Sequence, residues 1–125
     1  MPNHNKIDYV EFAARDMQAT KQFFTEVFGW SFEDYGPEYT AFSNQGVDGG
    51  FYSAEKNSNF EANGSLIIFF SEDLESTQSA IEQAGGTISQ QIFSFPGGRR
   101  FHFTEPSGNE MAVWSNKDEN GEVIS

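Results

Sequence analysis

The chain has 125 residues, which is enough for one compact domain and too short for two ordinary ones. Its 19 acidic and 7 basic residues give a formal charge of −12, which repels nucleic-acid backbones and anionic membranes. It contains no cysteine, which excludes disulfides, zinc–thiolate sites and thiol nucleophiles.

The N-terminal residues carry no apolar segment of the kind found in secretory signals. The longest apolar run, residues 66–70, is far shorter than the ~20 residues that cross a bilayer. We therefore expect a cytoplasmic protein without a membrane or nucleic-acid partner, and no role for His4 near the chain start.

The first half of the chain reads as a strand, a helix and three further strands. An extended apolar segment over residues 7–13 precedes Asp16, a residue type that caps helix N-termini. Apolar side chains then recur at helical spacing up to Gly29, which suits a left-handed helix end. Strand-like segments separated by Gly, Pro and Asn turn residues follow at 30–34, 39–43 and 49–53.

The second half repeats this order. Residues 73–77 (Asp-Leu-Glu-Ser-Thr) match residues 16–20 (Asp-Met-Gln-Ala-Thr) in the order acidic, apolar, polar, small and Thr. An apolar segment precedes the match, and a helical pattern ending at a Gly pair follows it. The remaining strand-like segments are residues 87–95, 100–104 and 110–115. We predict one domain made of two βαβββ modules, about 6–55 and 64–115, with a loose polar tail over 116–125.

Two short motifs sharpen this prediction. Val-Phe-Gly-Trp at residues 27–30 closes a Phe-rich helix, and Glu-Pro-Ser-Gly-Asn at 105–109 precedes the last strand. In this order the pattern over residues 7–115 resembles the glyoxalase/bleomycin resistance/dioxygenase superfamily. The resemblance implies an α+β fold, in which two βαβββ modules form an eight-stranded, cupped mixed sheet with helices on the outer face. It also implies a ligand in the cup and a homodimer.

The resemblance places the divalent-metal ligands of the family at Tyr9, Gly50, Leu66 and Ala112 in this sequence. Glycine, leucine and alanine have no side chain that binds an ion, and a lone phenol is a poor ligand at neutral pH. We therefore expect a degenerate metal site and no metal cofactor. Glyoxalase-type isomerisation and ring cleavage depend on such an ion.

Two side chains are candidates for acid–base catalysis. Alternation puts Glu11 on the face of Tyr9, where desolvation would suit a general base, or Glu11 pairs with a rim cation such as Lys6. His102 is either a catalytic group or a structural hydrogen-bonding residue. With Glu110, these two could also form a displaced divalent-metal site, which stays open.

The adjacent cations Arg99 and Arg100 suit a carboxylate or phosphate ligand, or else serve only to keep a hairpin soluble. Phe23, Phe24 and Phe28 form a helix stripe that predicts a core. The small residues Gly50 and Ala112 should leave room at the centre of the cup, unless aromatic rings fill it. The residues expected to line the ligand site are Tyr9, Glu11, Tyr52, Phe70, Arg100, His102 and Trp114.

These features favour a protein that binds a small apolar or aromatic molecule in an aromatic-lined cavity without a metal. A metal-dependent or acid–base lyase, isomerase or dioxygenase of the same superfamily is the first alternative. A protein-binding module whose acidic surface docks a basic protein is the second.

Overall fold

The computed structural model of this chain describes residues 4–62 and 64–124. The fold class is α+β, as predicted, and each half has the order strand, helix, three strands. The elements are β1 (Tyr9–Ala14), α1 (Met17–Phe28), β2 (Phe32–Asp34), β3 (Tyr39–Phe42), β4 (Asp48–Ser53), β5 (Ile67–Phe70), α2 (Leu74–Gln83), β6 (Thr87–Phe95), β7 (Gly98–Thr104) and β8 (Glu110–Ser115).

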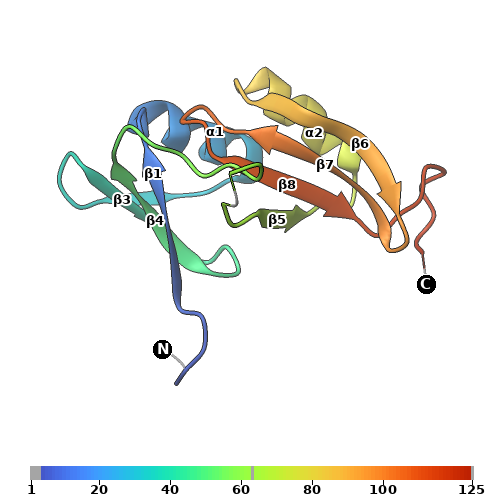
Figure 1. The fold of residues 1–125 in the computed structure, drawn as a ribbon, viewed down its shortest axis with the longest axis horizontal. Coiled ribbons are helices and arrows are strands. Elements are labelled where there is room, and N and C mark those ends of the chain that lie inside the picture. Colours follow the sequence, from blue (N-terminus) through green and yellow to red (C-terminus); the bar gives the residue numbers. More distant parts are fainter. Residues whose placement is uncertain (1–3, 63, 125) are drawn as a thin grey trace.

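The eight strands divide evenly between two mixed sheets (Figure 1). Sheet A has the order β1-β4-β3-β2, and sheet B has the equivalent order β5-β8-β7-β6. In each sheet the first strand of the module pairs in parallel with the last, and the other pairs are antiparallel. The two modules therefore share one topology, as the sequence repeat predicts.

Both helices begin at the predicted aspartates. The Asp16 carboxylate accepts the Ala19 N–H at 3.1 Å, and the Asp73 carboxylate accepts the Ser76 N–H at the same distance. These bonds satisfy backbone donors that have no partner inside the first turn of a helix. Helix α1 ends at Gly29, whose φ of 72° lies in the left-handed region.

A single hydrophobic core joins the two modules. Helix α1 lies between the sheets in Figure 1, and its phenylalanines contact both of them. The Phe24 ring lies 5.6 Å from Phe51 of sheet A, whereas Phe23 lies 5.8 Å from Phe103 of sheet B. Phe28 stacks on Phe69 of β5 at 4.3 Å. The helices and this core therefore cover one face of each sheet, called the inner face below, and the opposite face, which carries no helix of the described part of the chain, is called the outer face.

The turn between β7 and β8 fastens the second module to the first. Glu105 is 2% exposed, and its carboxylate accepts hydrogen bonds from Thr20 Oγ1 of α1 and from Asn109 Nδ2, both at 2.7 Å. Asn109 Nδ2 also donates to the carbonyl of Ala13 in β1 at 2.8 Å. A buried carboxylate is tolerated when several donors surround it, as they do here.

The C-terminal segment forms a turn. Lys117 pairs with Val123 in an antiparallel bridge, and the Ile124 N–H donates to the Asn116 carbonyl at 2.8 Å. Composition alone misses this turn, because a polar tail and a polar hairpin look alike in sequence. None of the helices in the described part of the chain is long and apolar enough to span a bilayer.

Candidate functional site

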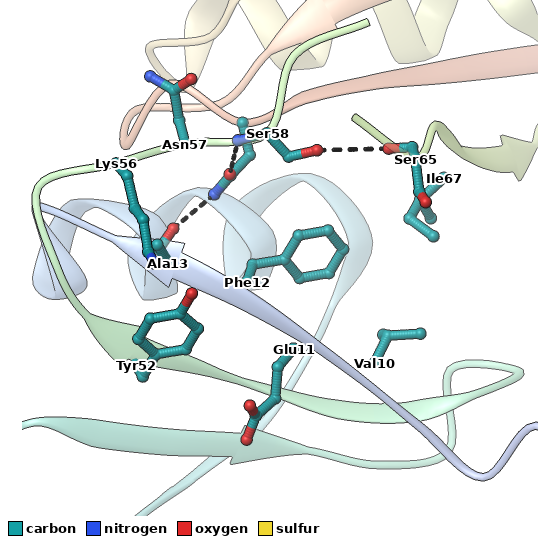
Figure 2. A pocket seen from close by; sticks show the side chains of 11 residues that line it. Val10, Glu11, Phe12, Ala13, Tyr52, Lys56, Asn57, Ser58, Ser65 and Ile67 are labelled. Carbon is teal, nitrogen blue, oxygen red and sulfur yellow. Dashed lines mark hydrogen bonds between the residues drawn. The ribbon is translucent and has the colours of Figure 1, made fainter. Parts of the chain in front are cut away.

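The outer face of sheet A collects tyrosines and carboxylates. The strand register aligns Glu11 of β1 with Gly50 of β4, Gly50 with Ala41 of β3, and Ala41 with Glu33 of β2, so these positions share one face. Tyr9, Tyr39 and Tyr52 lie on the same face by alternation. Phe12 and Phe51, at the intervening positions, are buried in the core. Figure 2 shows Glu11 and Phe12 on opposite sides of β1.

Three of these side chains form a hydrogen-bonded chain. The Tyr39 hydroxyl donates to the Glu11 carboxylate at 2.9 Å, and the Tyr9 and Tyr39 hydroxyls lie 2.7 Å apart. Because the single proton of Tyr39 goes to Glu11, Tyr9 must donate to the Tyr39 oxygen. Burial, together with the Tyr9 hydroxyl and the Glu11 carboxylate, raises the pKa of Tyr39 well above its usual range. Tyr39 is therefore a neutral phenol that fixes the Glu11 side chain.

Gly50 does not leave room on this face, contrary to the expectation. A Cβ atom at this position would collide with the Tyr39 hydroxyl and would lie 2.7 Å from Tyr39 Cζ. The ring of Tyr39 fills the space. Which side chain fills it depends on the β3–β4 register, which the turn between these strands sets and which the sequence pattern does not reveal.

The residues at the implied metal positions do not fit an ion. Tyr9 is engaged with Tyr39, Gly50 faces the same ring, and Leu66 and Ala112 carry hydrocarbon only. Across residues 4–62 and 64–124, no three His, Asp or Glu side chains come close enough together to hold a metal ion.

A cavity of about 490 Å³ lies beside the free edge of β1 (Figure 2). Glu11 and Tyr52 line it from sheet A, and the loop between β4 and β5 lines it through Lys56, Asn57 and Ser58. The Lys56 ammonium lies 5.8 Å from the centroid of the Tyr52 ring, within the range of a cation–π contact. Glu11 is the only carboxylate among the residues described around this cavity, and Lys56 is the only cation.

The outer face of sheet B is lined by rings rather than hydroxyls. Register aligns Ile68 with Ala112 and His102, and Phe70 with Trp114 and Arg100. The Phe70 and Trp114 rings meet edge to face, with centroids 5.2 Å apart. Ala112 is fully buried, so it leaves no open space at the centre of this face. The prediction that Gly50 and Ala112 would leave room is therefore wrong on both sheets.

His102 lies at the centre of this aromatic surface with its side chain 1% exposed. Its Nδ1 atom is 3.3 Å from Glu110 Oε2, and the rings of Phe60 and Phe93 lie 5.5 and 6.2 Å away. Burial alone would raise the pKa of Glu110, but hydrogen bonds from the Phe60 N–H, His102 and Ser89 lower it. Glu110 is thus an ionised acceptor that orients the imidazole.

Two nitrogen atoms on this face, Arg100 Nε and His102 Nε2, are buried and have no hydrogen-bond partner among residues 4–62 and 64–124. Arg100 also packs on the Phe93 ring, with its guanidinium carbon 5.4 Å from the ring centroid. Its neighbour Arg99 points to the opposite side and pairs with Glu75 of α2 at 2.5 Å. The two adjacent arginines therefore have different surroundings, and only Arg100 is on the outer face.

The structure divides the predicted ligand-lining residues into two groups. Sheet A carries one group, which comprises Tyr9, Glu11 and Tyr52. Sheet B carries the other, which comprises Phe70, Arg100, His102 and Trp114. Glu11 accepts a hydrogen bond from Tyr39 on sheet A, whereas His102 and Glu110 pair on sheet B. The displaced metal site of these three residues is therefore not assembled in residues 4–62 and 64–124. Glu11 is also exposed rather than desolvated.

Three residues on these faces were missed from the sequence. Tyr39 reads only as a strand residue, because its register partner is Tyr52 and its contact with Gly50 is diagonal. Phe93 shares the face of Arg100 through the β6–β7 register, which contains irregularities that no periodicity reveals. Phe60 lies in the loop between modules, where no pattern predicts a contact with His102.

The geometry agrees with comparisons to known proteins. A glyoxalase-related enzyme from Fulvimarina pelagi superposes with a TM-score of 0.75 at 16% identity, over 97% of this chain and 98% of the other. A glyoxalase/bleomycin resistance protein/dioxygenase family enzyme from Burkholderia phytofirmans PsJN gives 0.72 at 16% identity, over 88% and 98%. A lactoylglutathione lyase from Agrobacterium tumefaciens gives 0.66 at 17% identity, over 89% and 93%.

Identities this low establish the fold alone. A search of curated protein sequences gives no match. The model of one family, however, matches residues 6–113, which is most of the chain. The chain therefore belongs to the glyoxalase/bleomycin resistance protein/dioxygenase superfamily.

Proposed function

We propose that this protein binds a small, flat aromatic molecule on the outer face of sheet B, without a metal ion. The observation that carries the proposal is a pair of buried nitrogens, Arg100 Nε and His102 Nε2, which lie on one face of β7 among aromatic rings and have no partner in the described part of the chain. A buried polar atom without a hydrogen bond costs about 1–3 kcal/mol. A ligand that displaces the Phe60 and Phe93 rings from beside these atoms and bonds to both therefore has a thermodynamic advantage.

The exposed surface around these atoms supports an aromatic ligand. Phe60, Ile68 and Phe70 are each about half exposed, at 50%, 44% and 52%. Together with Trp114 they give an apolar surface on which a planar ring can pack. Contiguous apolar side chains on a surface, bordered by polar groups, mark contact sites for a ligand or a partner.

The hydrogen-bonding roles define the polar part of the ligand. When His102 Nδ1–H is donated to the Glu110 carboxylate, Nε2 is left as an acceptor, whereas Arg100 Nε–H is a donor. The two residues are successive on one strand face, about 7 Å apart at their Cα atoms. An aromatic ring bearing a carboxylate for Arg100 and a neighbouring hydroxyl for His102 satisfies both atoms.

Calorimetric titration with 3-hydroxy-2-naphthoate tests this function. We expect binding that weakens about tenfold in Arg100→Gln and in His102→Asn, since each loses one polar contact worth about 1.4 kcal/mol. Arg99→Gln is the matched control, because it removes the adjacent guanidinium on the opposite face. Unchanged affinity in Arg100→Gln, or equal losses in both arginine variants, would overturn the proposal.

The same pair of side chains supports a second candidate, an acid–base enzyme of the superfamily. A buried imidazole oriented by an ionised carboxylate is an arrangement that removes protons from substrates. His102 Nε2 would accept a proton from a carbon next to a carbonyl group. Exchange of the CH₂ hydrogens of 2-hydroxyacetophenone in D₂O, followed by NMR, should then be accelerated by the protein and lost in His102→Asn. No acceleration over buffer would reject this candidate and leave ligand binding untouched.

A further inference from the structure

The cavity beside β1 is distinct from the surface on sheet B and has opposite chemistry. It borders the outer face of sheet A, where Glu11 and Tyr52 line it. Its volume of about 490 Å³ is within the range of small-molecule sites. The only carboxylate described in its lining is fixed in place, because the Tyr39 hydroxyl holds Glu11 at 2.9 Å.

The hydrogen-bond directions leave acceptors on the outer face of sheet A, which the cavity borders through Glu11 and Tyr52. Tyr39 uses its proton on Glu11, and Tyr9 uses its proton on Tyr39. The Tyr9 oxygen and the second oxygen of Glu11 therefore keep lone pairs that no described hydrogen bond in residues 4–62 and 64–124 occupies. Such atoms recognise a donor, and the negative charge of Glu11 favours a positively charged one.

Lys56 shows how a cation is accommodated beside this face. Its ammonium lies over the Tyr52 ring at 5.8 Å, near the outer limit of a cation–π contact, and no ion pair with a carboxylate is among its described contacts. The side chain is exposed and belongs to the loop between the modules. A ligand cation can take the same place on Tyr52 while also reaching Glu11.

We propose that the cavity beside β1 binds an organic ammonium ion, with Glu11 as its counter-ion and Tyr52 as its aromatic contact. Tyr39 is a positioning residue, because it acts by holding Glu11. Lys56 competes with the ligand for the Tyr52 ring. An anionic ligand would instead use Lys56 and be repelled by Glu11, so the two alternatives predict effects of opposite sign.

Calorimetric titration with benzylammonium, benzyl alcohol and benzoate distinguishes these ligand charges. We expect benzylammonium to bind at least tenfold more tightly than benzyl alcohol, and benzoate to bind more weakly than either. Benzyltrimethylammonium keeps the charge but has no N–H donor, so it should bind more weakly than benzylammonium. Equal affinities for benzylammonium and benzyl alcohol, or tighter binding of benzoate, would overturn the proposal.

Single substitutions test the assigned roles. Glu11→Gln should weaken benzylammonium binding at least tenfold, Tyr39→Phe should weaken it about fivefold, and Lys56→Gln should strengthen it. Glu38→Gln is the matched control, because it removes the carboxylate next to Tyr39 in the chain and should change the affinity less than twofold. Tyr39→Phe keeps the ring that packs at Gly50, and circular dichroism verifies that each variant is folded. Weaker binding in Lys56→Gln, or no change in Glu11→Gln, contradicts the assignment.

The proposals for the two sheets can be tested independently of each other. Arg100→Gln should leave benzylammonium binding unchanged, and Glu11→Gln should leave 3-hydroxy-2-naphthoate binding unchanged. If either variant abolishes both, the two surfaces act as a single site, and the assignment of a separate ammonium site is wrong.

Discussion

The outer faces of sheets A and B come from equivalent strands of a repeated module. They differ in whether their polar side chains have hydrogen-bond partners. On sheet A, Tyr9, Tyr39 and Glu11 satisfy one another near the surface. On sheet B, His102 and Arg100 each have a buried nitrogen that finds no partner among the described residues. The comparison teaches that a duplicated scaffold fixes where side chains point but not how their hydrogen bonds are completed.

The largest expected effect is the loss of the Glu110 carboxylate. Glu110→Ala removes the acceptor for the Phe60 N–H, Ser89 and His102, and its side chain is only 14% exposed. We expect urea denaturation to show a loss of about 2–4 kcal/mol in the free energy of unfolding, since several partners lose their bonds. Glu11→Ala should cost less than about 1 kcal/mol, because Tyr39 can turn to water. Equal losses would remove the distinction between the faces.

The second prediction concerns the contact between Gly50 and Tyr39 on sheet A. Gly50→Ala should lower the free energy of unfolding by about 1–3 kcal/mol, because the new methyl group meets Tyr39 and lies 2.8 Å from the carbonyl oxygen of Thr40. The double variant with Tyr39→Ala should cost less than the sum of the two single changes. Strict additivity would mean that Tyr39 does not occupy the space beside Gly50.

The unsatisfied nitrogens predict a stabilising change on sheet B. Arg100→Met keeps an apolar stem against Phe93 and removes the buried Nε atom. We therefore expect the free energy of unfolding, measured by thermal denaturation, to rise by about 1 kcal/mol. Arg99→Met should give no gain, because Arg99 has a partner in Glu75. A destabilised Arg100→Met variant would indicate that Nε has a partner in solution.

Ionisable groups on the two faces should make the stability of the protein fall at opposite ends of the pH range. The pKa of Glu110 is lower in the folded chain than its ordinary value of 4.5, so unfolding takes up protons in acid. Its contribution is present above pH 4.5 and is lost as the pH falls through the lower folded pKa. Glu110→Gln should flatten the acid side of a melting-temperature profile, and an unchanged slope would contradict this assignment.

The alkaline change in stability arises from Tyr39 on sheet A. The pKa of Tyr39 is raised above its ordinary value of 10.0, so the folded chain keeps this proton after the unfolded chain has lost it. The contribution of this phenol is therefore present below pH 10.0 and is lost as the pH rises above it. Tyr39→Phe should reduce the alkaline fall in melting temperature without affecting the acid side.

Local features of the fold could be predicted from the sequence. Asp16 and Asp73 cap the helices because their side chains accept backbone N–H groups that any helix leaves free. Alternation assigned Tyr52 and His102 to the faces opposite Phe51 and Phe103, because successive strand residues point to opposite sides.

The composition of the site could not be predicted in the same way. Alternation gives the face of one strand but not the relation between two sheets, so Glu11 and His102 were grouped together although they lie on different sheets. The turn that sets the β3–β4 register decides that Tyr39 meets Gly50. Homodimer formation, the cytoplasmic location and the ligand itself stay predictions.

The shared core has a consequence for synthesis on the ribosome. Phe23 and Phe28 of α1 find their partners in Phe103 and Phe69, which are made much later. Chains are synthesised from the N-terminus at about 5–20 residues per second. The rings of the first helix are therefore exposed to water for several seconds before their partners have been made. The turn at Glu105 that fastens the modules is also made late. Nascent chains that stall before Phe103 should therefore be targets for chaperones that bind exposed aromatic segments.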